Sequence, residues 1–405
     1  MQLLLTMCAS ASLLQSSLTL MQLLLTTCAS ASLLQSSLTR SVIIHRHGDR
    51  SPLHSLTSST SPDAKWLSKT KFDSEELFWF DSLPKRELDT KVMAKVTFSG
   101  KDQQEHWANG VPPYGRLSLL GFLQLINVGS EIQSNLSILV GRPLSKSDVL
   151  FSSTNFDRTK RSAVGFSIGF FGDDNDDSEL IIDNLSADIF VPDRDGDKGP
   201  LTEHHAAGSP DVDVLALRKR LSRFVREKIF LESSEPDNEA SCPEPFHPMR
   251  LFDLFVVSKE RKLLSSSVPE NPDVATLESV CARGWGEWVR TGSGRKMIGR
   301  AGWEEVIDWL TEPKNPILKM VSAHDSTILS LVHLFGSLEY LENRPKKLSD
   351  TIPPYASYLQ INLFEGNLIQ FKFMQHVVVP LFGCPHDEQG FVHLEDLLKI
   401  KQTFV

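Results

Sequence analysis

A short apolar run that ends in a cluster of cations is the feature of this sequence that most limits how it can fold. Residues 41–45 read as a buried strand, which Gly48 and Pro52 bring to an end. The six residues 45–50 (HRHGDR) hold two arginines and two histidines. The cations are therefore expected at the carboxyl end of a strand, which is where α/β sheets bind their ligands.

Strand and helix patterns alternate after this run. Apolar residues recur at helical spacing in GRLSLLGFLQLINVGSEI, which predicts a helix over about 118–138. A strand at 149–152 follows, and then a helix that begins near Asp157. The order strand, helix, strand, helix is the signature of an α/β sheet.

The same pattern resumes near the carboxyl terminus. The segment 317–323 (ILKMVSA) predicts a strand, and residues 328–336 (ILSLVHLFG) predict the helix that follows it. Alternating residues in 358–364 and 368–374 flank Glu365-Gly366-Asn367, which predicts a β-hairpin. The chain thus returns to the sheet after a long intervening segment.

The fold class predicted is α/β, a mixed sheet with helices on both faces. The sheet is expected from about 41–52, 115–190 and 300–400. Two remaining stretches, the insertion at about 53–114 and the middle at about 200–295, are expected to form a mostly helical cap over the carboxyl ends of the strands.

Three helices are predicted in the middle of the chain. An amphipathic stripe from Val214 to Val225 predicts the first, and its basic residues read as a solvated face. Further helices are expected at about 248–265 and 273–290.

The first 40 residues contain a tandem duplication. MQLLLTMCASASLLQSSLTL is followed by a copy that differs at its seventh and last positions. Each copy has an apolar stretch and an Ala-Ser-Ala triplet, as in a targeting leader, but no Lys or Arg precedes Arg40. A leader and a duplication with Met21 as initiator both remain open. We exclude 1–39 from the fold and expect one domain over 40–405.

Charge and cysteine content exclude several classes of function. The net charge of −9 and the isoelectric point near 5.8 argue against a nucleic-acid or anionic-membrane surface. No apolar run is long enough for a transmembrane span. The cysteines form no C-x-x-C pair, so neither a structural zinc site nor a dense disulfide framework is expected. They are Cys8, Cys28, Cys242, Cys281 and Cys384.

The basic cluster suits one kind of ligand. A single His or Arg after a strand is more often structural, but Arg46 and Arg50 can each grip two anionic oxygens, and phosphate fits that fork. His47 lies between them, so its imidazole could reach the phosphorus that they hold. Such a histidine would act as a nucleophile and would need no metal.

Several segments, in order, resemble the histidine phosphatase superfamily, acid phosphatase branch. The segments are RHGDRSP (46–52), GRLSLLG (115–121), SSTNFDRTKRSA (152–163), SAHDSTI (322–328), PPYASYL (353–359) and GCP (383–385). They cover most of 41–400. The resemblance implies a histidine-phosphatase-like α/β fold and a metal-independent phosphomonoesterase that uses no cofactor.

The resemblance also assigns roles to residues. It implies that His47 is the phosphorylated nucleophile and that Asp325 donates a proton to the leaving oxygen. The residues implied to bind the phosphoryl group are Arg46, Arg50, Arg158 and His324. The chemistry agrees, because an expelled alkoxide needs a proton and the transferred oxygens carry charge that arginines stabilise.

This chain departs from the family pattern at three places. His45 stands where relatives usually have an apolar residue, so it is either a strand residue or a further contact to the site. Phe151-Ser152-Ser153-Thr154 replaces the usual Ile-Arg-Ser-Thr, which should spare catalysis because Arg158 remains. Cys384 lacks its usual partner nearby, which puts a secreted or lysosomal location in doubt and leaves the compartment open.

The substrate is less constrained than the reaction. The long 53–114 link, the sequence STNFDRT and the C-terminal segment are most like the lysophosphatidic acid phosphatase group, so lysophosphatidate or another small phosphomonoester is expected. Aromatic residues of the link either line an acyl pocket or pack in its own core. The alternatives are a phytase or inositol phosphate phosphatase, and a pseudoenzyme that only binds phosphorylated ligands. Partners beyond the substrate, including the oligomeric state, are left open.

Overall fold

The computed structural model describes most of the chain from residue 37 to residue 403. The described residues are 37–53, 96–99, 115–172, 179–185, 212–227, 246, 248–260, 272–291, 301–335, 338–341, 348, 351–380 and 384–403. Residues 1–36 and most of the 53–114 insertion lie outside these ranges, so neither the leader nor an acyl pocket in the insertion is described.

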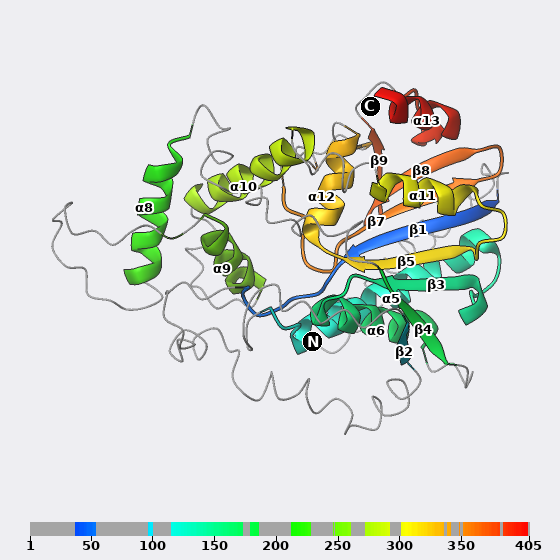
Figure 1. Ribbon diagram of the computed structural model, residues 1–405, viewed down its shortest axis with the longest axis horizontal. Helices are drawn as coiled ribbons and strands as arrows, with labels where there is room; N and C mark the ends of the chain where they lie inside the picture. Colours follow the sequence, from blue (N-terminus) through cyan, green and yellow to red (C-terminus); the bar gives the residue numbers. More distant parts are fainter. Residues whose placement is uncertain are drawn as a thin grey trace, which may run out of the picture.

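The described strands form one mixed sheet (Figure 1). They are β1 (Leu38–Arg46), β2 (Val96–Ser99), β3 (Val149–Ser153), β4 (Leu180–Asn184), β5 (Leu318–Ala323), β6 (Leu338–Tyr340), β7 (Tyr358–Phe364), β8 (Leu368–Phe373), β9 (His376–Pro380) and β10 (Phe391–His393). Their order is β2-β4-β3-β5-β1-β7-β8-β9-β6, and β10 pairs with β8. The half from β2 to β1 is parallel, and the half from β1 to β6 is antiparallel. The predicted fold class is thus confirmed.

The described helices cover both faces of the sheet and its end. They are α5 (Leu119–Val140), α6 (Asp157–Phe171), α8 (Val214–Val225), α9 (Pro248–Glu260), α10 (Pro272–Thr291), α11 (Ala301–Thr311), α12 (Asp325–Leu334) and α13 (Leu394–Thr403), with a short 3-10 turn, η2, at Lys146–Asp148.

Alternation along β1 produces two hydrophobic cores, because successive side chains of a strand point to opposite faces. Val42 and Ile44 pack with buried residues of α11, α12 and α13. Ile43 packs with α5 and α6 on the other face. Figure 1 shows these two groups of helices on opposite sides of the sheet. β1 is central because it is apolar on both faces.

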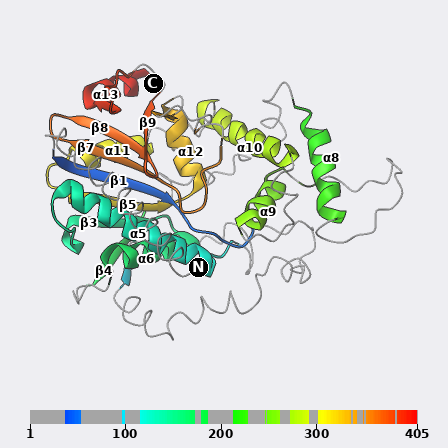
Figure 2. The same ribbon diagram turned by 180° about the vertical axis from the view of Figure 1, so that it is seen from behind.

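The helices α8, α9 and α10 lie beyond the carboxyl end of β1, as both views show (Figures 1 and 2). They share a third apolar cluster, and Leu329 of α12 joins that cluster to the sheet domain. None of the helices in the described ranges is long and apolar enough to cross a membrane. The assignment of whole segments to a core and a cap stays a prediction.

Two boundaries differ from the sequence prediction. The strand expected at 41–45 runs from Leu38 to Arg46, so Leu38 and Thr39, excluded with the leader, belong to the sheet. Leu38 is buried and pairs with Phe364, which extends the strand. Residues 96–99 were expected in the cap but form the edge strand β2, parallel to β4. Val-Thr-Phe-Ser is too short a run to show periodicity.

The loop after β1 is held against the start of α5. Ser118 donates from its hydroxyl to the Asp49 carboxylate at 2.5 Å, and its backbone N–H donates to the Asp49 carbonyl at 2.9 Å. Gly48 and Gly121 are in direct backbone contact, since a Cβ on either would lie 2.1 Å from a carbonyl oxygen of the other segment. We call residues 47–52 the phosphate loop, after the ligand that the sequence predicts for it. Its position depends on these contacts.

Replacing Gly121 by alanine should displace the phosphate loop. The new methyl group would meet the Asp49 carbonyl, which is backbone and cannot rotate away. We expect Gly121→Ala to lower the free energy of unfolding by about 1–3 kcal/mol, measured by urea unfolding. Ser130→Ala, on an exposed position of the same helix, should change it by less than about 0.5 kcal/mol. Equal stability of the two variants would contradict the close approach.

His45 is a core residue. It is fully buried, its ring stacks on Phe166 with 5.4 Å between centroids, and its Nδ1 lies 3.0 Å from the Arg46 carbonyl. Of the two alternatives, the strand residue is the one observed. Burial lowers the pKa of His45 from 6.5 to about 4, although the bond to the Arg46 carbonyl opposes this shift.

This histidine should make stability fall in acid. The unfolded chain binds a proton near pH 6.5 that folded His45 binds only near pH 4. The free energy of unfolding should therefore drop by up to about 3 kcal/mol across that window. His45→Gln should flatten the slope by about one proton, measured by urea unfolding between pH 7 and 4. His393→Gln, at an exposed position, should not. An unchanged slope in His45→Gln would refute the assignment.

Candidate active site

The structure brings all six sequence-predicted site residues to one end of the sheet. β1, β3 and β5 are parallel neighbours, so their carboxyl ends meet. The six residues follow those ends. They are Arg46 at the end of β1, His47 and Arg50 in the phosphate loop, Arg158 in the first turn of α6, His324 at the N-cap of α12, and Asp325, its first residue.

One ring nitrogen of His47 is hydrogen-bonded to the backbone, and the other carries a lone pair that can react. Its Nδ1 lies 2.9 Å from the Gly48 carbonyl, which can only accept, so Nδ1 carries the proton and Nε2 has the lone pair. Its ring lies 5.6 Å from that of His324, edge on. Burial lowers the pKa of His47 well below 6.5, and the charges of Arg158, Arg50 and Arg46 lower it further. Both effects favour the neutral form of the imidazole.

Arg46 is fixed on three sides. It donates to the Pro353 carbonyl at 2.6 Å and pairs with the Asp325 carboxylate at 2.9 Å. Its guanidinium lies over the Tyr355 ring, 4.1 Å from the centroid. Asp325 is 28% exposed while Arg46 is 3% exposed, so the carboxylate lies on the open side of the site.

Arg50 is held by a residue of the helical subdomain, by which we mean α8, α9 and α10. It pairs with Asp253 of α9 at 2.8 Å and donates to the Ser51 carbonyl at 3.0 Å. Burial alone would lower the pKa of Arg50, but the Asp253 carboxylate raises it above its ordinary value.

Arg158 and His324 are neighbours. An Arg158 Nη lies 3.4 Å from Nδ1 of His324, and Nε2 of His324 lies 3.1 Å from the Thr154 hydroxyl. Burial lowers the pKa of His324 well below 6.5, and the three arginines add to that shift. Burial and then the charge of Arg50 lower the pKa of Arg158. Binding of an anion would relieve both penalties.

The three arginines have in common a buried hydrogen-bond donor, the Nε–H group. Each has a buried Nε–H that finds no hydrogen-bond partner within the described chain. Buried donors are nearly always satisfied, and leaving one unmet costs about 1–3 kcal/mol. Three such donors around one imidazole fit a ligand with several anionic oxygens. The residues concerned are Arg46, Arg50 and Arg158.

Two residues of the site were not identified from the sequence. Asp253 lies inside the helix expected at 248–265, where nothing separates it from other acidic residues. Tyr355 lies in PPYASYL, so its segment was noted but not the residue. Its hydroxyl is buried and has no partner within the described chain, and burial raises its pKa.

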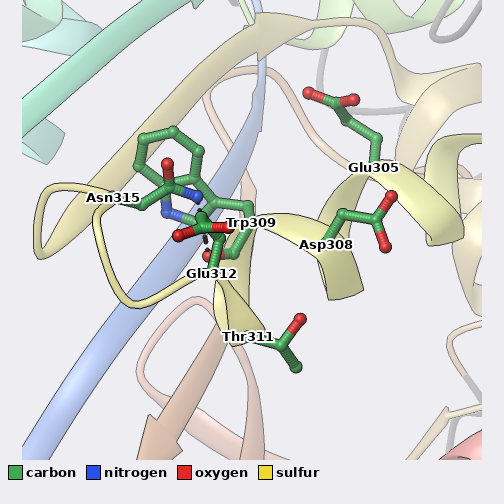
Figure 3. Close-up of a pocket in the computed structure, with 6 residues that line it drawn as sticks. All are labelled: Glu305, Asp308, Trp309, Thr311, Glu312 and Asn315. Atoms are coloured by element: carbon green, nitrogen blue, oxygen red, sulfur yellow. Dashed lines mark hydrogen bonds between the residues drawn. The ribbon is translucent and has the colours of Figure 1, made fainter.

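A hollow of about 520 Å³ lies on α11 (Figure 3). It is lined by Glu305, Asp308, Trp309, Thr311, Glu312 and Asn315. Arg40, near the amino end of β1, donates to the carbonyl of Leu310 in α11 and so places this helix at that end of the strand. Six residues of strand separate Arg40 from Arg46, which is roughly 20 Å at about 3.3 Å per residue. The acidic lining of the hollow repels anions. In the described ranges, His, Cys, Asp and Glu form no group of three that could hold a metal ion.

A family model matches the first part of the chain. Residues 37–215 match the model of the histidine phosphatase superfamily, branch 2. No curated protein matches the chain.

Three solved structures show the same fold. Hafnia alvei phytase in complex with myo-inositol hexakis sulphate has a TM-score of 0.58 at 14% identity, covering 92% of this chain and 98% of that one. The phytase from Citrobacter braakii has 0.54 at 14%, covering 91% and 98%. Klebsiella sp ASR1 phytase has 0.53 at 12%, covering 91% and 96%. At these identities the likeness shows the fold alone.

The expected lysophosphatidic acid phosphatase subtype is not supported, because the three structures named above are described as phytases. The coarser resemblance, to the histidine phosphatase superfamily, rests on the match over residues 37–215. Residues 37–215 are therefore similar to the histidine phosphatase superfamily, branch 2, and the chain has the mixed α/β fold of the solved phytases.

Proposed function

We propose that the chain is a metal-independent phosphomonoesterase that works through a phosphohistidine. The observation that carries the proposal is the convergence of three buried guanidinium groups, each with an unpartnered Nε–H, on one neutral imidazole. A phosphoryl group supplies the acceptor oxygens and the negative charge that such a site lacks.

The first step is attack by His47. Its Nε2 lone pair forms the N–P bond while the P–O bond to the leaving group breaks. Proton-bearing Nδ1 holds the ring in place through the Gly48 carbonyl. Charge on the transferred oxygens is stabilised by the arginines and by His324, which are positioned before the reaction begins.

Asp325 acts as the acid and then as the base of the reaction. In its protonated form it donates to the departing oxygen, and its carboxylate then takes a proton from the water that attacks the phosphohistidine. That second attack breaks the N–P bond and releases inorganic phosphate. The position of Asp325 on the open side supports this role, because the leaving group must lie toward solvent.

For the substrate we favour an inositol phosphate over lysophosphatidate. The structures with the same fold are described as phytases, and one holds myo-inositol hexakis sulphate. The aromatic insertion that suggested an acyl pocket lies mostly outside the described residues. The pseudoenzyme alternative is disfavoured because His47 and Asp325 are both in place.

His47→Ala should lower turnover of p-nitrophenyl phosphate at least about 1,000-fold, because the covalent step is lost. Acid-quenched wild type should carry acid-labile phosphate, and the variant should carry none. Turnover by wild type should survive a metal chelator. His386→Ala, which removes an exposed imidazole, should behave as wild type. Labelling of another residue in wild type would overturn the nucleophile assignment.

Asp325→Asn should separate substrates by their leaving group. With an alkyl phosphate we expect a loss in kcat of about 100-fold or more, because the alkoxide needs a proton. With p-nitrophenyl phosphate, whose leaving group departs without one, the loss should stay below about tenfold. The two substrates are compared by steady-state kinetics.

A capping role for Asp325 gives the opposite result. Its carboxylate also accepts from the Ser326 N–H at 2.8 Å, and asparagine caps a helix almost as well as aspartate. Small and equal effects on both substrates would therefore remove the proton-donor role. Arg158→Ala should lower kcat/KM for both substrates, because Arg158 holds the phosphoryl oxygens throughout the reaction.

A further inference from the structure

Asp253 is a carboxylate at the phosphate site for which the reaction has no use. One of its oxygens lies 2.8 Å from Nη1 of Arg50, and the other accepts from the Leu53 N–H at 2.7 Å. The side chain is 12% exposed. It comes from α9, about 200 residues along the chain from the loop that it contacts. It is therefore a fixed charge placed at the site by the helical subdomain.

This carboxylate changes the charge that the site offers. Three guanidinium groups face two carboxylates, Asp325 and Asp253, and both histidines are held neutral. The phosphate loop also carries the buried Asp49 carboxylate, so the fixed charges near the site offer no surplus of positive charge for several phosphates. A site for a substrate with many phosphates would gain from more cations, and Asp253 works against that.

We propose that Asp253 is a specificity-determining residue that favours substrates with one phosphate over polyphosphorylated ones. The inference rests on the proposed function and narrows its substrate class to lightly phosphorylated inositols and similar monoesters. A second phosphate on a neighbouring ring carbon lies only several ångströms from the first, and so within reach of the Asp253 charge. At that range, in a partly buried site, the repulsion between two like charges is substantial.

The test compares the binding of two intact ligands in a His47→Ala background. Dissociation constants for myo-inositol monophosphate and myo-inositol hexakisphosphate are measured by calorimetry at neutral pH and one ionic strength. Adding Asp253→Asn should lower the dissociation constant of the hexakisphosphate about tenfold more than that of the monophosphate. Asp273→Asn removes an equal charge from an exposed pair with Arg220 in the same subdomain, and should change the ratio less than twofold.

Each outcome has one meaning. An unchanged ratio in Asp253→Asn, or equal weakening of both ligands, would make Asp253 only a clamp for Arg50 and would overturn the inference. Asp253→Ser is a second variant without the charge, and if neither variant shows cooperative unfolding the ion pair is structural and the inference also fails. If neither ligand binds the parent protein, the phosphate site itself is wrong. If both bind and wild type releases phosphate, the proposed function stands whatever Asp253 does.

Discussion

Three guanidinium groups buried around one imidazole are the interaction on which the rest of the structure depends. Like charges in a low-dielectric site repel, so side-chain contacts alone would not gather them. Backbone does so instead, because Arg46 ends a central strand, Arg50 lies in the loop after it, and Arg158 begins α6. Burial and then the neighbouring charge of Arg50 lower the pKa of Arg158. The site thus holds an electrostatic cost that an anion relieves.

Such a site requires a loop that does not relax. Residues 47–52 form no helix or strand, and contacts with other segments hold them, among them an isolated β-bridge between Arg50 and Leu117. Ser118 and Gly121 of the next helix hold Asp49 and Gly48, and the His47 carbonyl accepts from Ala356 at 3.2 Å. Ala356 adopts φ 57°, a left-handed conformation that costs an alanine about 1 kcal/mol, and this turn follows Tyr355, which lies beside Arg46. Strain in the backbone is thereby tied to the placement of a cation.

The residues that the sequence revealed share a physical property. Arg46, His47 and Arg50 lie within one loop after a strand, and His324 and Asp325 also follow a strand directly, so chemistry and local pattern coincide. Asp253 and Tyr355 act through contacts between distant segments, which no local pattern records. The edge strand β2 was not predicted for a related reason, because its four residues are a strand only through their pairing with β4. Local pattern finds the reacting groups and misses the residues that set their charge.

The two carboxylates of the site come from different parts of the fold, and this separates two functions. Asp325 belongs to the sheet domain, pairs with Arg46 and is 28% exposed, where a leaving group can reach it. Asp253 belongs to the helical subdomain, pairs with Arg50 and is 12% exposed, where it holds a charge without meeting the reacting bond. Changes in the sheet domain therefore alter the chemistry itself. On the roles proposed above, changes in α9 would alter the net charge that a substrate meets while His47 and Asp325 stay in place, so the substrate range could vary without a change in the reaction.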